Sequence, residues 1–80
     1  MTREEVYERL NEVFRDVLDD EAIKLQDETV ADDVDGWDSF EHINLIVAVE
    51  EEFEFKIPMG KTVTMKNVGE MVDLILEKGK

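Results

Sequence analysis

The sequence predicts an all-α fold: a small four-helix bundle of three main helices and one short helix, with a long loop between the first two main helices. Three segments carry apolar residues at steps of three and four, and each opens with a residue that favours a helix N-terminus. No stretch alternates apolar and polar residues for long enough to indicate a strand. We expect one domain, residues 1–80, whose thin core leaves little room for a deep active site.

The first helix is expected from about Arg3 to Leu18. Thr2 and Glu5 have the spacing of a capping box, in which each side chain accepts a hydrogen bond from the backbone N–H of the other residue. One apolar stripe, which predicts a single face against the core, is formed by Val6, Leu10, Val13, Phe14 and Val17.

The periodicity fades from Asp19 to Trp37, which indicates one long loop. A loop of this length is uncommon in a compact domain and tends to be functional. A few apolar side chains are expected to pin the loop to the core: Ile23, Leu25, Val30 and Val34.

The second helix is expected to begin sharply. Asp38 is a good N-cap residue, Glu41 follows three residues later, and Gly36 supplies a turn just before. The helix should run to about Glu52 or Phe53. Its apolar surface is broad, which predicts a central helix with neighbours on more than one side.

The second helix must end before Pro58, because the residue that precedes a proline avoids the helical region. A short turn of helix is expected within Met59–Thr64. The last helix is expected to open at Asn67, with Glu70 three residues later and Gly79 just past the end. Its apolar stripe consists of Val68, Met71, Val72, Ile75 and Leu76.

The charge is strongly acidic, with 22 acidic against 9 basic residues and a formal net charge of -13. Such a chain repels nucleic acids and anionic membranes. The charge either steers partner proteins with basic surface patches toward the chain or only keeps the domain soluble. The sequence has no cysteine, hence no disulfide and no thiolate metal site. The N-terminal residues lack the pattern of a signal peptide, and no apolar run could span a membrane, so a cytoplasmic location is expected.

Ser39 is the residue most suited to carry a chemical group. It stands in the first turn of the second helix, where its hydroxyl can face solvent while a capped helix holds the backbone. A helix N-terminus favours negative groups, so a phosphate ester on this hydroxyl would be stabilised. On local sequence alone, a serine that only solvates the helix end is the better-supported interpretation.

The wider pattern closely resembles the acyl carrier protein family. The matching residues run from Asp38-Ser39 through the apolar stretch Leu45–Val49 to Glu50–Phe53 and Ile57-Pro58, and the resemblance covers nearly the whole chain. It implies a carrier rather than an enzyme, with 4′-phosphopantetheine from coenzyme A esterified to Ser39. The arm would hold acyl or related intermediates of fatty acid, polyketide or other lipid metabolism as thioesters and present them to partner enzymes.

The resemblance also implies roles for other residues. Asp38 would cap the helix and lie where a phosphopantetheinyl transferase meets the carrier, and the carrier is expected to be a monomer. An acidic recognition face for acyl-loading, condensing or transferring enzymes would consist of Glu41, Glu50, Glu51 and Glu52. The core, or an acyl cavity between the helices, would be lined by Phe40, Ile43, Ile46, Val49, Ile57, Met65, Met71 and Ile75.

Two features depart from the typical fatty-acid carrier. Phe40 replaces the usual leucine after the serine, and Met59–Thr64 carries no acidic residue. The lead-in Gly36-Trp37-Asp38 also looks more like specialised carriers, including polyketide, peptidyl and D-alanyl ones. These features suggest a specialised rather than a housekeeping member.

Three other functions compete with that of a carrier. Calcium binding at Asp33 and Asp35 in an EF-hand loop would need acidic residues where Ala31 and His42 stand. A hydrolase using Ser39, His42 and Asp38 lacks the Gly-x-Ser-x-Gly turn and an evident oxyanion hole. An acidic helical interaction module that is never modified would keep the fold and lose the cofactor, and it stays open at this point.

Overall fold

The computed structural model describes residues 1–58, 60 and 66–78. Within them it confirms an all-α fold, with helices α1 (Arg3–Leu18), α2 (Ser39–Phe53) and α4 (Val68–Lys78) and one 3-10 turn, η1 (Ala31–Asp33). The short helix predicted within Met59–Thr64 falls outside the described residues, of which only Gly60 belongs to that segment.

Helix α1 has the predicted bounds and the predicted capping box. The Glu5 backbone N–H donates to Thr2 Oγ1 over 3.1 Å, and the Thr2 N–H donates to Glu5 Oε1 over 3.2 Å. The second of these bonds stabilises the carboxylate and lowers the pKa of Glu5. Asp19 ends the helix in the left-handed conformation, and its N–H donates to the Arg15 carbonyl.

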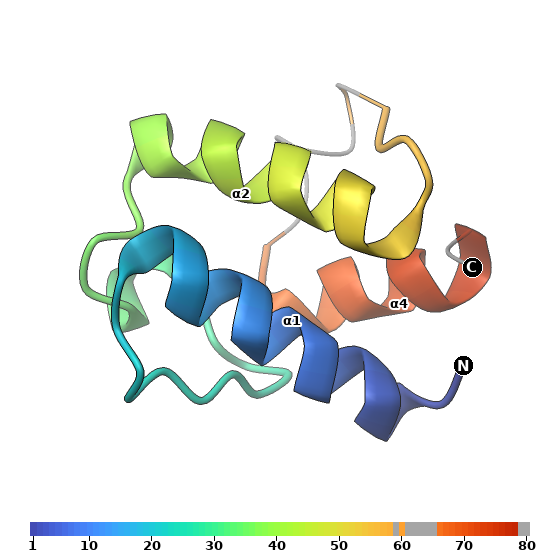
Figure 1. The fold of residues 1–80 in the computed structure, drawn as a ribbon, viewed down its shortest axis with the longest axis horizontal. Helices are drawn as coiled ribbons and strands as arrows, with labels where there is room; N and C mark the ends of the chain where they lie inside the picture. The colour runs from blue at the N-terminus through green and yellow to red at the C-terminus, as the bar shows by residue number, and fades with distance from the viewer. Residues whose placement is uncertain (59, 61–65, 79–80) are drawn as a thin grey trace.

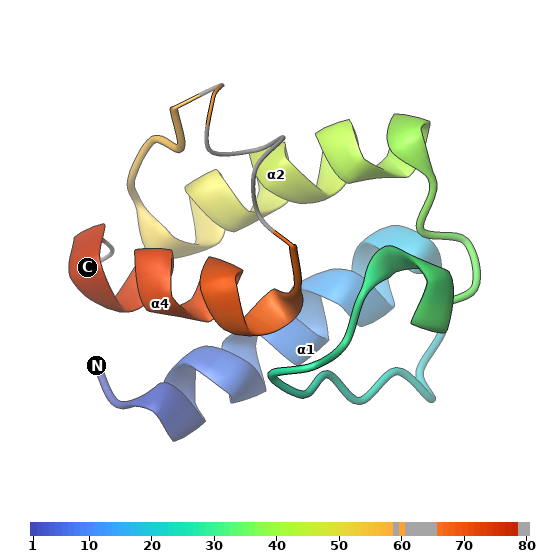
Figure 2. The same ribbon diagram turned by 180° about the vertical axis from the view of Figure 1, so that it is seen from behind.

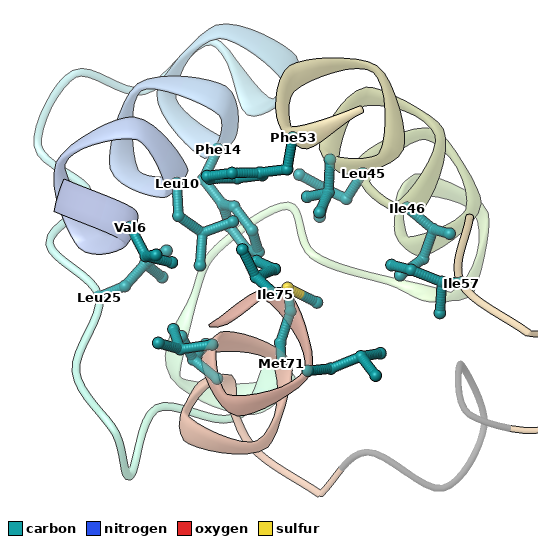
Figure 3. Packing of buried hydrophobic residues seen from close by; sticks show 14 of the residues in the cluster. Val6, Leu10, Phe14, Leu25, Leu45, Ile46, Phe53, Ile57, Met71 and Ile75 are labelled. Carbon is teal, nitrogen blue, oxygen red and sulfur yellow. The ribbon is translucent and has the colours of Figure 1, made fainter. Parts of the chain in front are cut away.

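The three helices surround a shared core (Figure 1). Helix α1 packs against both α2 and α4 and runs antiparallel to α2. Seen from behind, the long loop after α1 crosses below α1 and α4 before it returns to the start of α2 (Figure 2). Side chains from the three helices and from the loop meet in the interior, as Figure 3 shows for Leu10, Leu45 and Met71.

The loop between α1 and α2 is anchored at three of the four predicted positions, whereas Val30 is half-buried outside the core cluster. Ile23 and Leu25 are buried in the core, and Val34 packs against it. Polar contacts with α1 support these side chains, because Arg15 Nε donates to the Ile23 carbonyl over 2.8 Å and the Leu25 N–H donates to Asn11 Oδ1 over 2.8 Å. The turn η1 adds local order that the sequence did not predict.

The same loop is also bound to the start of α4. The Val68 N–H donates to the Thr29 carbonyl over 2.9 Å, and the Gly69 N–H donates to the Asp27 carbonyl over 3.0 Å. A Cβ atom at position 69 would lie 3.0 Å from that Asp27 oxygen, so this close approach favours glycine. Helix α4 is capped as predicted, with the Glu70 N–H on Asn67 Oδ1 at 3.0 Å.

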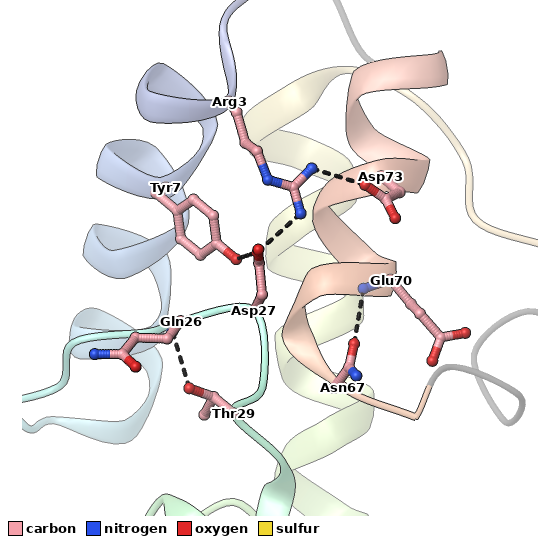
Figure 4. A network of polar contacts seen from close by, with 8 residues as sticks. All are labelled: Arg3, Tyr7, Gln26, Asp27, Thr29, Asn67, Glu70 and Asp73. Atoms are coloured by element: carbon pink, nitrogen blue, oxygen red, sulfur yellow. Dashed lines mark hydrogen bonds and ion pairs between the residues drawn. The ribbon is translucent and has the colours of Figure 1, made fainter.

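A polar clamp, formed by Arg3, Tyr7, Asp27 and Asp73, joins α1, the loop and α4 (Figure 4). The Arg3 guanidinium lies 2.7 Å from Asp73 Oδ1 and 2.8 Å from Asp27 Oδ1, and the Tyr7 hydroxyl donates to Asp27. The bond from Tyr7, and to a lesser extent the bond from Arg3, lowers the pKa of Asp27. The clamp is solvent-exposed, so its contribution to stability is small.

Candidate functional site

Ser39 is the first residue of α2, and its side chain is exposed. Asp38 before it has extended backbone angles, and its Oδ1 accepts the Glu41 N–H over 2.8 Å. The Asp38 carbonyl accepts the first intrahelical bond, from the His42 N–H, also over 2.8 Å. A serine hydroxyl is therefore displayed on a helix start whose backbone is fixed by a side-chain cap.

The helix start lies at one end of the bundle. Both ribbon views place the first turn of α2 at the end of the molecule opposite the start of α1 and the end of α4 (Figures 1 and 2). The backbone N–H groups of a helix start carry partial positive charge, which stabilises an attached phosphate. Ser39 is also the only serine of the sequence, so a modification specific for serine has one possible site.

The residues that lead into α2 are held against the core. Gly36 has a φ of 87°, a conformation that favours glycine, and the Trp37 N–H donates to the Val34 carbonyl over 3.2 Å. The Trp37 ring meets the buried ring of Phe14 edge-on, with centroids 5.0 Å apart. Trp37 Nε1 also donates to His42 Nδ1 over 3.1 Å. No local sequence pattern predicts this Trp37–His42 contact.

The structure corrects the predicted positions of Phe40 and Ile43. They do not line the core: their exposed fractions are 74% and 65%. Successive helix residues turn by about 100°, so with Leu45 facing inward, Phe40 and Ile43 face away from the interior. Val47, which is 49% exposed, continues the same side. Phe40, Ile43 and Val47 thus form the apolar stripe on the outer side of α2.

Most of the other predicted core positions are buried. The core prediction is confirmed for Ile46, Val49, Ile57, Met71 and Ile75. Met65 lies outside the described residues. On α2 the buried and exposed residues differ in helical phase, since Leu45 and Val49 lie on the inner side and the apolar stripe lies opposite to them.

The four glutamates expected to form one acidic face do not share one side of α2. Glu50 is bonded to the segment after the helix, where its Oε2 accepts the Ile57 N–H over 2.7 Å. Glu52 faces α1, where its Oε2 lies 2.7 Å from Arg9 Nε. Glu41 accepts a bond from Asn44 Nδ2 over 3.0 Å and is half-buried, whereas Glu51 is exposed.

The alternatives can be compared with this geometry. Asp33 Oδ2 accepts the Val30 N–H over 3.1 Å, which commits that carboxylate to the η1 turn. Over the described ranges 1–58, 60 and 66–78, no three His, Cys, Asp or Glu side chains are grouped so that they could hold a metal ion. His42 Nδ1 accepts from Trp37, so this nitrogen does not serve as a base toward Ser39. Across the same part of the chain, no helix is long and apolar enough to cross a membrane.

Fold and site together define the class of the protein: a small acidic helical domain that displays one serine at the capped start of its central helix, as carrier domains do. The chain is 33% identical over 76 residues to an acyl carrier protein of Picosynechococcus sp., and this match covers 94% of this chain and 93% of the relative. It is 35% identical over 80 residues to an acyl carrier protein of Petrotoga mobilis, and this match covers 98% of this chain and 92% of the relative.

A solved structure agrees with these relatives. The solution NMR structure of a holo acyl carrier protein from Geobacter metallireducens matches with a TM-score of 0.85 and 42% identity, over 91% of this chain and 84% of that one. No family model matches the chain. The chain belongs to the acyl carrier protein family, and its role is that of a carrier.

Proposed function

We propose that this chain carries acyl-type intermediates as thioesters on a 4′-phosphopantetheine arm attached to Ser39. The observation that carries the proposal is the exposed hydroxyl of Ser39 on the capped first turn of α2. The relatives bear the name acyl carrier protein, and the similar solved structure is a holo form. The chain itself supplies attachment and presentation and no catalysis, and the arm supplies the thiol that holds the cargo.

The residues around Ser39 fit a phosphodiester. Attachment forms a bond between Ser39 Oγ and the phosphorus that bears the pantetheine of coenzyme A, and it breaks the pyrophosphate bond, so that adenosine 3′,5′-bisphosphate leaves. The serine proton passes to a base of the transferase. The capped helix start holds Oγ in place and favours the negative charge of the product. Asp38, exposed beside Ser39, is the proposed transferase contact in addition to its role as cap.

The partner enzymes are proposed to dock on the outer side of α2. This side offers the apolar stripe of Phe40, Ile43 and Val47, which begins directly beside Ser39, with the exposed Glu51 along its edge. A partner that fits would have an apolar surface with basic residues at its rim, because the chain carries a net charge of -13. Glu50 and Glu52 contribute charge to this recognition, while their carboxylates bind within the chain.

The setting of the carrier follows from the family. We infer a monomer that works in the cytoplasm, in a specialised acyl, polyketide or related lipid pathway. The large exposed ring of Phe40 beside the attachment residue and the absence of acidic residues within Met59–Thr64 support a specialised set of partners.

The test is intact mass spectrometry after incubation with coenzyme A and a broad-specificity phosphopantetheinyl transferase. The expected result is a gain of one phosphopantetheinyl group in the natural sequence and none in Ser39→Ala. The matched control is Thr29→Ala, which removes a hydroxyl in the loop and should leave the gain intact. A folded natural chain that gains no mass would instead support the unmodified interaction module.

A further inference from the structure

Trp37 and His42 flank the attachment residue and are bonded to each other. Trp37 lies two residues before Ser39, in the last part of the loop, and His42 lies three residues after it, on the next turn of α2. Trp37 Nε1 donates to His42 Nδ1 over 3.1 Å, and the two rings are nearly parallel, with an interplanar angle of 18° and centroids 6.0 Å apart. The contact closes a small ring of chain that contains Asp38 and Ser39.

This closed segment is fixed to the hydrophobic core. The indole also meets the ring of Phe14 edge-on, and Phe14 is fully buried on α1. The backbone N–H of Trp37 donates to the Val34 carbonyl, and this bond fixes the last residues of the loop before α2. One end of the segment is thus tied to α1 and the loop, and the other end to the second turn of α2.

We propose that Trp37 and His42 are positioning residues for Ser39: their hydrogen bond fastens the loop to α2 and holds the attachment hydroxyl in the geometry that the transferase requires. This inference rests on the proposed function and extends it to a mechanism of presentation. Without the contact, the Asp38 cap would still form the helix, but the path of the chain into it would be less restricted. The transferase would then have to order the segment on binding, which weakens productive encounter.

The chemistry of the pair is defined by the donor. An indole N–H only donates, so His42 Nδ1 is the acceptor of this bond. A typical hydrogen bond contributes about 0.5–1.5 kcal/mol, so the expected effect of its loss is about two- to tenfold. Trp37→Phe removes the N–H donor and keeps an aromatic ring against Phe14, which makes it the sharpest single variant.

The test measures kcat and KM of Ser39 modification for a matched set of variants, with saturating coenzyme A and the carrier as the varied substrate. Trp37→Phe and His42→Leu should each lower kcat/KM about fivefold, mainly through KM, and the double variant should lose no more than either single variant. His42→Asn, whose side-chain oxygen keeps an acceptor near Nδ1, should retain most of the natural rate. Tyr7→Phe is the control, because it also removes one hydroxyl or N–H donor, but in the polar clamp and not beside Ser39.

A second measurement does not depend on the transferase. Trp37 is the only tryptophan, so its indole N–H gives one NMR resonance. His42→Leu should shift that resonance, speed its hydrogen exchange and lower the amide order parameters of Asp38 and Ser39, whereas Tyr7→Phe should change none of these. Rates and order parameters equal to those of the natural chain in folded Trp37→Phe and His42→Leu would overturn the inference and leave the proposed function intact. A natural chain that is never modified would overturn the proposed function instead.

Discussion

The two sides of α2 have similar hydrophobicity and opposite surroundings. Leu45, Val49 and Phe53 on the inner side are fully buried, whereas Phe40 and Ile43 on the outer side are mostly exposed. The hydrophobic effect rewards burial only where neighbouring elements cover the side chain. The inner side therefore stabilises the fold, and the outer side keeps apolar surface available next to Ser39.

Among the substitutions that test the difference between the two sides of α2, Leu45→Ala should lower the free energy of unfolding the most. It removes a fully buried side chain from the helix that carries Ser39 and leaves a cavity, so the free energy of unfolding should fall by about 2–5 kcal/mol. Urea denaturation followed by circular dichroism measures the change. A loss no greater than that of an exposed substitution would show that the inner side of α2 is not part of the core.

Phe40→Ala should separate stability from partner recognition. The ring is 74% exposed, so the free energy of unfolding should change by no more than about 0.5 kcal/mol. If the ring is an anchor of the docking face, kcat/KM of the transferase or of an acyl-loading enzyme should fall by about tenfold or more. Val47→Ala, on the same stripe and farther from Ser39, should give the smaller loss. An unchanged kcat/KM for both variants would exclude the apolar stripe from docking.

Glu50→Ala and Glu51→Ala should differ in stability, because the first glutamate is bonded within the chain and the second is exposed. The Glu50 carboxylate holds the Ile57 N–H, so its loss should cost about 1–3 kcal/mol, while loss of the exposed Glu51 should cost less than about 0.5 kcal/mol. Thermal unfolding of the two variants side by side measures the difference. Equal midpoints would mean that the Glu50–Ile57 bond adds nothing to stability.

Asp27→Asn should produce the smallest effect, and it should depend on pH. The pKa of Asp27 is lowered by Tyr7 and then Arg3, so the folded chain binds this proton less tightly than the unfolded chain does. The contribution of Asp27 to stability is therefore present above its ordinary pKa of about 3.9 and is lost as the pH falls through the lower pKa of the folded state. Unfolding midpoints between neutral and acidic pH should fall less steeply in the variant. Parallel curves for the two chains would show that the clamp does not shift this titration.

The sequence predicts the helices well because their signals are local. Thr2, Asp38 and Asn67 each accept a bond from the N–H three residues later, as a cap must, and no distant residue is needed to foresee it. Burial around α2 is harder to predict, because both of its sides are apolar in sequence. The family resemblance places Phe40 and Ile43 in the core, and only the position of α1 and α4 shows which side of α2 is covered.

Contacts between elements lie beyond local patterns. The bond from Trp37 to His42 depends on how the loop returns to α2, and the bond from the Ile57 N–H to Glu50 depends on how the chain turns after the helix. The exposed hydroxyl of Ser39 could be predicted, because a capped helix start restricts the residue that follows. The residues that hold it in place could not, since they act through the path of a 19-residue loop from Asp19 to Trp37.

The opposite placement of the first turn of α2 and the outer ends of α1 and α4 has a practical consequence (Figure 1). A label, a bead or a neighbouring protein held near residue 1 or near residue 78 would lie at the end of the molecule opposite the Ser39 hydroxyl. Molecules immobilised through these ends should therefore turn Ser39 toward the solution. This orientation suits the chain to surface-based capture of the enzymes that load and unload it.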